Sequence, residues 1–322
     1  MAISLSLPSK PTFVLVSGAW HDTSYWNKVV ACLAKQGYRA APVALRSASA
    51  EPTTTFINDV EAVREVIRKE VSRGCDVVVV AHSLGAVAGA SAIKGFAHSH
   101  GCRGDENEQD TTATISVLNE NGKGRGHVIG FVALATGFLP TGVCFLQAVG
   151  GRPPSLWRFS SESLVTTEED VEDDGENTTR AFATIRVSAR EAFYNDMPIE
   201  EGKQWVERLS PQSAATITQG GEFVYSGCTM LESGHYRRPG VPPEAQRAMA
   251  QAARDAGADI WSEEIAAGHS PMLSRPAETV DFLRRAAVAF GDKASGIRRE
   301  GLVTGNVKHE TFCLEAHEVH IL

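Results

Sequence analysis

The fold is decided by the stretch Asp76-Val77-Val78-Val79-Val80-Ala81-His82-Ser83-Leu84-Gly85-Ala86-Val87-Ala88-Gly89. Its four consecutive valines are typical of a strand that is buried on both faces of a parallel sheet. The small residues after Ser83 predict a helix, so this serine falls on a sharp turn between strand and helix. Such a turn is the geometry of a nucleophile elbow, where N–H groups at the helix start can bind an oxyanion. The alternative is an ordinary strand-to-helix turn in which the serine caps the helix.

The segments on either side of this stretch alternate between predicted strands and predicted helices. Before it, apolar runs predict strands at residues 12–17 and 38–45, and helical spacing predicts helices at 25–36 and 56–71. After it, strands are predicted at 127–135, 222–228 and 258–265, and helices at 190–209, 242–255 and 276–290. Alternation of this kind implies right-handed crossovers and therefore an α/β protein with a mostly parallel sheet.

Composition and charge limit the classes of partner. The chain has 322 residues, 43% of them apolar and 22% charged, with a formal net charge of −8. An acidic chain lacks the basic footprint that nucleic acids or anionic membranes attract, and no apolar run reaches the length of a membrane span. The six cysteines are scattered without CxxC spacing, and the N-terminal residues do not resemble a secretory signal. We therefore expect a cytoplasmic protein with a small-molecule substrate; a homodimer stays open.

Changes in composition predict how the chain is divided. Residues 1–135 form the first part of the core, and the polar, glycine-rich residues from about 97 to 126 are interpreted as a surface insertion. Residues 136–218 are less regular and have the position of a cap over a cleft. Their acidic run at 168–174 is read as a solvated loop rather than a metal site. Residues 219–290 complete the core, and 291–322 form a weakly patterned tail.

Four short motifs, in this order, carry a resemblance to a known family. They are residues 13–20 (FVLVSGAW), 77–85 (VVVVAHSLG), 193–196 (FYND) and 267–276 (AGHSPMLSRP). The sequence resembles the α/β-hydrolase superfamily, in the branch of plant methylesterases, hydroxynitrile lyases and their fungal and bacterial relatives. The resemblance implies the α/β-hydrolase fold, with helices on both faces of a mostly parallel sheet and an inserted cap.

The resemblance also implies roles for particular residues. Ser83 is the expected nucleophile, and His269 is the expected base that takes its proton and later returns it to the leaving group. The backbone N–H groups of Ala19 and Leu84 are expected to form the oxyanion hole. The side chains and backbone expected to contact the substrate are those of Gly18, Trp20, His82, Trp157, Phe193 and Tyr194.

The acid that would orient His269 is the main departure from the family pattern. Relatives carry an aspartate a few residues after the penultimate strand, where this chain has Leu231. Glu232, next to that position, is the first candidate, and Asp196 in the cap motif is the second. If neither reaches His269, the site is a Ser–His dyad. Smaller departures are Ser17 in place of the family's histidine and Ala81 in place of its first elbow glycine.

These motifs predict a serine hydrolase that cleaves a small carboxylic ester, lactone or thioester through an acyl-enzyme intermediate. The alternative is a non-hydrolytic enzyme on the same fold, a lyase, dehydratase or cyclase that acts on a natural-product intermediate. Cyanide chemistry is disfavoured, because hydroxynitrile lyases have Thr and Lys where this chain has Gly18 and Ser270. A binding protein without turnover is the third class. No cofactor and no metal is implied, since there is neither a phosphate-binding glycine loop nor a metal-ligand cluster.

Overall fold

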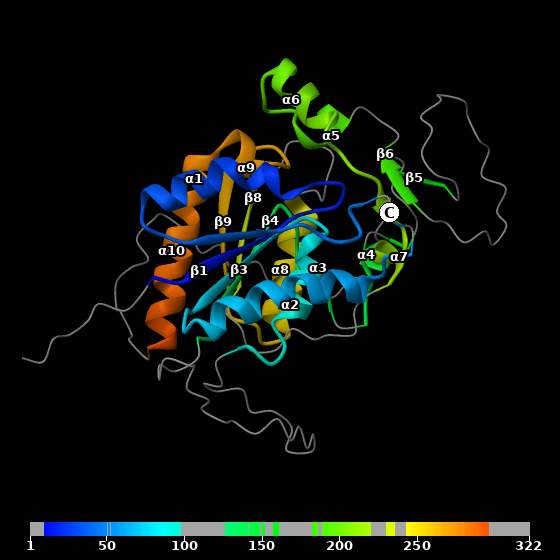
Figure 1. The fold of residues 1–322 in the computed structure, drawn as a ribbon. Coiled ribbons are helices and arrows are strands. Elements are labelled where there is room, and N and C mark those ends of the chain that lie inside the picture. The colour runs from blue at the N-terminus through cyan, green and yellow to red at the C-terminus, as the bar shows by residue number, and fades with distance from the viewer. Residues whose placement is uncertain are drawn as a thin grey trace, which may run out of the picture.

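A six-stranded sheet forms the centre of the molecule (Figure 1). The computed structural model describes residues 10–49, 51, 53–97, 126–140, 142–148, 150–151, 157–160, 182–185, 189–219, 230–235 and 243–295. The strands lie in the order β2 (Ala40–Val43), β1 (Thr12–Val16), β3 (Val77–His82), β4 (Val128–Leu134), β8 (Met230–His235) and β9 (Ile260–Ala266). Each neighbouring pair is parallel, as the sequence predicts. The strand order reverses at β1, and ligands of open α/β sheets bind beside the carboxyl ends of the strands at such a point.

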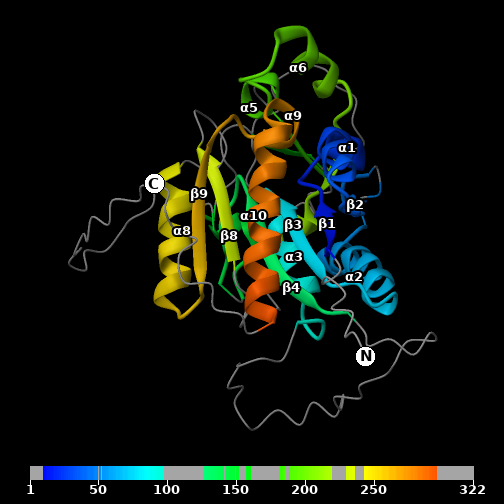
Figure 2. The same cartoon turned by 90° about the vertical axis from the view of Figure 1, so that its left-hand side faces the viewer.

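Helices cover both faces of this sheet (Figures 1 and 2). One face carries α1 (Asn27–Lys35), which follows the short 3-10 helix η1 (Thr23–Trp26), and α10 (Pro276–Ala294). The other face carries α2 (Phe56–Ser72), α3 (Gly85–Ala92) and α8 (Pro243–Asp255). Among the helices that the structure describes, none is both long and apolar enough to cross a bilayer.

Burial of β3 fixes the strand that ends at Ser83. All four of its valines are completely buried, and full burial of a valine side chain contributes roughly 2 kcal/mol. Helix α10 packs closely against the adjacent strand β4 at Gly130, because a Cβ atom at this position would overlap the ring of Phe290. The predicted central strand is therefore held from both faces.

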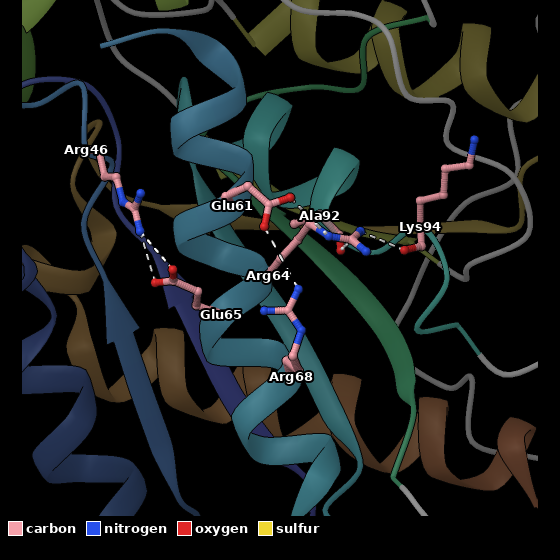
Figure 3. A network of polar contacts seen from close by, with 7 residues as sticks. All are labelled: Arg46, Glu61, Arg64, Glu65, Arg68, Ala92 and Lys94. Atoms are coloured by element: carbon pink, nitrogen blue, oxygen red, sulfur yellow. Dashed lines mark hydrogen bonds and ion pairs between the residues drawn. The ribbon is translucent and has the colours of Figure 1, made fainter. Parts of the chain in front are cut away.

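A polar network fastens α3 to α2 (Figure 3). The Arg64 guanidinium of α2 donates to the carbonyl oxygens of Ala92 at 3.2 Å and Lys94 at 2.8 Å, where α3 ends. The same guanidinium lies 3.6 Å from the Glu61 carboxylate and stacks over the Phe96 ring. A cation at this end of a helix satisfies terminal carbonyls and complements the helix dipole.

The insert, defined as the described residues between 135 and 219, carries a second, antiparallel sheet. Its strand β6 (Phe182–Ile185) pairs with β5 (Trp157–Ser160) and β7 (Gln212–Ser213). Its helices are α4 (Phe145–Ala148), α5 (Ala189–Phe193), α6 (Ile199–Val206) and α7 (Ala215–Thr218). In both views α5 and α6 lie beyond the end of the central sheet at which α9 (Pro271–Ser274) begins. The division into core, cap and tail stays a prediction.

Two expected elements differ in the structure. The helix predicted over 190–209 is two helices, α5 and α6, and the break lies before Pro198, which has no N–H to continue a helix. The penultimate core strand that the structure describes is β8, Met230–His235, which begins after the strand predicted at 222–228 would end. Its residues Met230-Leu231-Glu232-Ser233-Gly234-His235 lack a strand pattern, but pairing with β4 and β9 on both sides satisfies their backbone.

Several expectations fall outside the described residues. These are the strand predicted at 222–228, the acidic run at 168–174 and, apart from its first and last residues, the insertion at 97–126.

Candidate functional site

The turn after β3 has the expected elbow geometry. Ser83 has a φ of 51°, a left-handed conformation that is uncommon for a residue with a side chain. Its N–H donates to the carbonyl oxygen of Leu134 at 3.1 Å. Helix α3 then passes so close to the end of β1 that a Cβ atom on Gly85 would collide with the carbonyl oxygen of Ser17. The second glycine of the elbow pattern is therefore required by close packing of backbone against backbone.

The elbow presents Ser83 to His269. The Nε2 atom of His269 lies 3.1 Å from the Ser83 Oγ atom, although 186 residues separate them in sequence. Burial and, to a smaller extent, the nearby His21 together lower the pKa of His269 to about 3. The imidazole is therefore neutral at physiological pH and accepts the serine proton at Nε2, which assigns the other proton to Nδ1.

His82, the residue before Ser83, forms hydrogen bonds with the backbone of His269 and with the side chain of Tyr25. Its Nε2 atom donates to the carbonyl oxygen of His269 at 2.8 Å. Its Nδ1 atom therefore accepts, and the partner is the Tyr25 hydroxyl at 3.1 Å, which in turn accepts from the Gly18 N–H at 2.7 Å. Burial is the largest cause that holds the pKa of His82 well below its usual value. Both ring nitrogens of His82 are used within the protein and its side chain is fully buried, so this side chain positions its neighbours. Its expected contact with substrate stays a prediction.

In the loop after β1, two of three consecutive backbone N–H groups form hydrogen bonds with side chains. The N–H of Gly18 binds the Tyr25 hydroxyl, and the N–H of Trp20 binds Oε1 of Gln212 at 3.2 Å. Within the described part of the chain, no hydrogen bond uses the N–H of Ala19 or of Leu84. Neither N–H group expected to form the oxyanion hole is therefore used by another described residue, and the role of these two groups stays a prediction.

Trp20 shapes this loop through a strained backbone. Its φ of 65° lies in the left-handed region, which costs a bulky residue about 1–2 kcal/mol. Three hydrogen bonds to the insert offset that strain. The indole Nε1 of Trp20 donates to the Ala183 carbonyl at 2.8 Å, and the Trp20 carbonyl accepts from the Ser210 N–H at 2.8 Å. The third is the bond from the Trp20 N–H to Gln212. Both polar ends of this tryptophan are therefore tied to the insert.

A third histidine, His21, lies between this loop and the insert. Its Nδ1 atom donates to the Ala19 carbonyl oxygen at 2.6 Å, so its Nε2 atom accepts from the Tyr194 hydroxyl at 2.7 Å. Burial lowers the pKa of His21 to about 4 and raises the pKa of Tyr194 above its usual range. Buried surroundings thus disfavour charge on each of these side chains.

Aromatic rings of the insert pack against the Ser–His pair. The Phe193 ring lies 5.5 Å from the His269 ring and 5.6 Å from the Trp20 ring, between centroids. Trp157, another residue expected to contact substrate, lies on β5, but its side chain is outside the described residues. Phe193 and Trp20 therefore contact the site, while Tyr194 reaches it through His21.

The two candidate acids lie in different places. Asp196 accepts a hydrogen bond at Oδ2 from the N–H of Gly268, at 2.6 Å, so it binds the backbone of the residue before His269. Glu232 pairs with Ala133 and Ser262 in the middle of β8, not in a loop after the strand as we expected. The orientation of the Glu232 side chain lies outside the described residues. The choice of Glu232 or Asp196 as the acid stays a prediction.

Metal ligation finds no support in the described ranges, which contain no group of three or more His, Cys, Asp or Glu side chains arranged to bind an ion. Sequence reasoning missed His21, Tyr25 and Gln212, whose contacts depend on tertiary structure. For Tyr25, the sequence indicates only a residue near the start of a helix; for His21, it indicates only the residue that follows the motif at 13–20.

The fold and the Ser–His pair define the class of this protein. Residues 13–282 match the sequence model of the Alpha/beta hydrolase family, and the chain belongs to that family. The predicted resemblance and fold class are thereby confirmed.

Individual relatives are similar over part of the sequence or in fold. The chain is 38% identical over 88 residues to Alpha/beta hydrolase nvfD of Aspergillus novofumigatus, a match that covers 27% of this chain and 35% of that protein. The fold is similar to a mutant of polyneuridine aldehyde esterase (TM-score 0.62, 16% identity, 86% of this chain and 99% of that one). It is similar to tomato Methylketone Synthase I complexed with 2-tridecanone (TM-score 0.60, 17% identity, 88% and 99%). It is also similar to a pyrethroid hydrolase from Sphingobium faniae JZ-2 (TM-score 0.55, 16% identity, 87% and 98%). At these identities the structural likeness shows the fold alone.

Proposed function

We propose that this protein is a serine hydrolase that cleaves a small carboxylic ester, lactone or thioester. The observation that carries the proposal is the 3.1 Å contact between the Ser83 Oγ atom and the Nε2 atom of a neutral His269. A serine hydroxyl is a weak nucleophile until a base removes its proton, and a neutral imidazole at hydrogen-bond distance is such a base.

The reaction proceeds in two halves. Ser83 attacks the carbonyl carbon while His269 takes the hydroxyl proton, and the N–H groups of Ala19 and Leu84 bind the oxyanion. Collapse of this intermediate breaks the bond to the leaving group, which takes the proton from Nε2. A water molecule then attacks the acyl-enzyme, again with His269 as base, and releases the acid and free Ser83.

The surroundings of His269 set a condition on the rate. Burial disfavours the imidazolium that forms in each half-reaction, so a negative charge must stabilise it. The oxyanion supplies one such charge, and a carboxylate at Nδ1 would supply another. Glu232 is the first candidate for that carboxylate and Asp196 the second.

Labelling by a fluorophosphonate probe tests the proposal without knowledge of the substrate. We expect rapid labelling of the wild type and a loss of about 10³-fold or more in Ser83→Ala and His269→Ala. Ser91→Ala is the matched control, because Ser91 is a buried serine of α3 whose hydroxyl donates only to the Val87 carbonyl among the described groups. Unchanged labelling of Ser83→Ala would overturn the proposal.

The same assay assigns the acid. If Glu232 is the acid, Glu232→Gln slows labelling far more than Asp196→Asn does. If Asp196 is the acid, the order is reversed, because Asn retains an oxygen for the Gly268 N–H but removes the charge. Equal, small effects of both variants identify a Ser–His dyad.

A lyase, dehydratase or cyclase is the second candidate. Its support is that Asp196, the acid candidate within the cap motif, accepts at Oδ2 from the backbone N–H of Gly268. Turnover in water enriched in ¹⁸O separates the two functions. Hydrolysis incorporates one ¹⁸O atom into the carboxylic acid product, whereas elimination or cyclisation incorporates none.

A further inference from the structure

A completely buried glutamine of the insert holds the loop that carries the oxyanion donor. Gln212 lies on β7, and its Oε1 atom accepts from the Trp20 N–H at 3.2 Å. Its Nε2 atom donates to Ser47 Oγ at 2.6 Å and to Thr216 Oγ1 at 2.8 Å. A backbone N–H can only donate, so the amide oxygen must face Trp20 and the amide nitrogen must face the two hydroxyls.

A second buried group fixes the direction of this chain of hydrogen bonds. Asp59 of α2 accepts from both donors of Ser47, the N–H at 2.9 Å and the hydroxyl at 2.6 Å. Because the Ser47 hydroxyl proton is used on Asp59, its oxygen is left to accept from Gln212. The hydrogen bonds therefore run in one direction, from Trp20 through Gln212 and Ser47 to a carboxylate that is almost fully buried.

The position of this chain beside Ala19 gives it a consequence for catalysis. The peptide groups that flank the Ala19 N–H are held on both sides, at Gly18 by Tyr25 and at Trp20 by Gln212. The carbonyl oxygen of Ala19 is held by His21. An oxyanion hole stabilises the transition state only when its donors are fixed in advance toward the oxygen. Trp20 also has a left-handed backbone that would relax if its N–H lost its acceptor.

From these contacts we infer that Gln212, oriented by Ser47 and Asp59, is a positioning residue for the oxyanion hole, so that the insert completes the catalytic site. The inference rests on the proposed hydrolase function. Gln212 acts through the backbone of Trp20 and does not itself contact the reacting atoms.

The first test replaces Gln212 and measures two properties. In Gln212→Met, we expect kcat for a p-nitrophenyl ester to fall about 10- to 100-fold with KM within about twofold, because the lost interaction stabilises only the transition state. Amide hydrogen exchange of the peptide that contains Trp20 should become faster in the same variant. Thr279→Val, which removes a side-chain hydrogen bond of an equally buried residue on α10, is the control for a merely structural effect.

Rescue by a conservative variant separates positioning from packing. A glutamic acid at position 212 would lie close to Asp59 and would therefore stay protonated. Its C=O can accept from the Trp20 N–H, and its O–H can donate to Ser47 in place of Nε2. We therefore expect the kcat of Gln212→Glu to be at least tenfold higher than the kcat of Gln212→Met.

Asp59→Asn tests the direction of the chain. An asparagine has one acceptor oxygen for the two Ser47 donors, so the Ser47 hydroxyl turns toward Gln212. The Ser47 O–H then faces the Nε2 N–H of Gln212, and two donors oppose each other. We expect lower kcat in Asp59→Asn, and little further loss when it is added to Gln212→Met, since both changes act through one chain.

Three outcomes would overturn the inference: wild-type kcat in a folded Gln212→Met variant, an equal loss of kcat in Thr279→Val, or full additivity of the Asp59 and Gln212 changes. Failure of the proposed function is distinguishable, because wild-type turnover of the ester would then persist in Ser83→Ala.

Discussion

His82 donates its Nε2 proton to the main-chain carbonyl of His269 at 2.8 Å, so the residue before Ser83 holds the loop that carries the histidine hydrogen-bonded to Ser83. Strands β4 and β8 separate β3 from β9 in the sheet, and this bond bridges the gap at the carboxyl ends. Since Tyr25 connects His82 to Gly18, one buried chain joins the loop after β1, the elbow and the histidine loop. The geometry at Ser83 thus depends on this buried chain of hydrogen bonds.

Tyr25→Phe should reveal that dependence. The change leaves the Gly18 N–H and the His82 Nδ1 atom without the hydroxyl that binds both. Leaving buried groups unsatisfied costs about 1–3 kcal/mol, so we expect a loss of that size in the free energy of unfolding, measured by urea denaturation, together with a lower kcat. Tyr38→Phe is the control, and its effect on kcat should be negligible. If Tyr25→Phe is as stable and active as wild type, the hydrogen-bonded chain does not position the site.

Gly268→Ala should displace the histidine loop. A Cβ atom at this position would lie 2.5 Å from the Oδ1 atoms of both Asn195 and Asp196, closer than real Cβ contacts. The loop or the insert must then shift, and we expect kcat to fall by 10²-fold or more, because misplacement of a catalytic group by about 1 Å has such an effect. The control is Gly291→Ala on α10, where a Cβ atom meets nothing within 4 Å and helix propensity favours alanine. Equal activity of the two variants would contradict this account.

Local patterns predicted the core because its strands and helices carry their own signals. The valines of β3, the glycine at position 85 and the proline at the start of α10 each specify nearby structure, and the structure bears them out. The strand β8 carries no such signal, since its pairing partners rather than its side chains make it a strand. For the same reason the loop position that we assigned to Glu232 was wrong.

In the candidate site too, some residues could be predicted from local motifs and others depend on tertiary contacts. Ser83 and His269 could be predicted because each lies in a recognisable motif, and they meet as expected. Gln212 could not, because its role depends on a hydrogen bond to Trp20, 192 residues away in sequence. A glutamine between a proline and a serine has no local pattern that indicates such a contact.

Arg64→Met should lower stability without an effect on catalysis. The methionine keeps much of the apolar stem but removes the donors to the Ala92 and Lys94 carbonyls at the end of α3. We expect the free energy of unfolding to fall by about 1 kcal/mol, with kcat within twofold, since Ser83 lies at the opposite end of that helix. Arg68→Met is the matched control, because its ion pair with Glu61 is half-exposed and spans 3.9 Å, so its loss should cost close to zero. A large effect on kcat in Arg64→Met would contradict the expectation.

Acid should destabilise the folded protein below about pH 6.5. Burial lowers the pKa of His21 to about 4 and that of His269 to about 3, and holds the pKa of His82 well below its usual value. As the pH falls through 6.5, the unfolded chain binds protons on these three histidines that the folded chain does not bind, so the free energy of unfolding decreases. Each such proton contributes a slope of about 1.4 kcal/mol per pH unit.

Asp59 opposes this trend and provides the test. Burial raises its pKa to about 6, so the folded chain binds a proton there that the unfolded chain does not, and the net difference between pH 5.5 and 4.5 is about two protons. Urea unfolding at a series of pH values should therefore give a slope of about 3 kcal/mol per pH unit in the wild type. In Asp59→Asn the opposing group is absent and the slope should approach that of three protons, about 4 kcal/mol per pH unit. A stability that is flat between pH 6.5 and 4.5 would mean that the histidines titrate equally in the folded and unfolded chains, and that their burial does not keep them neutral.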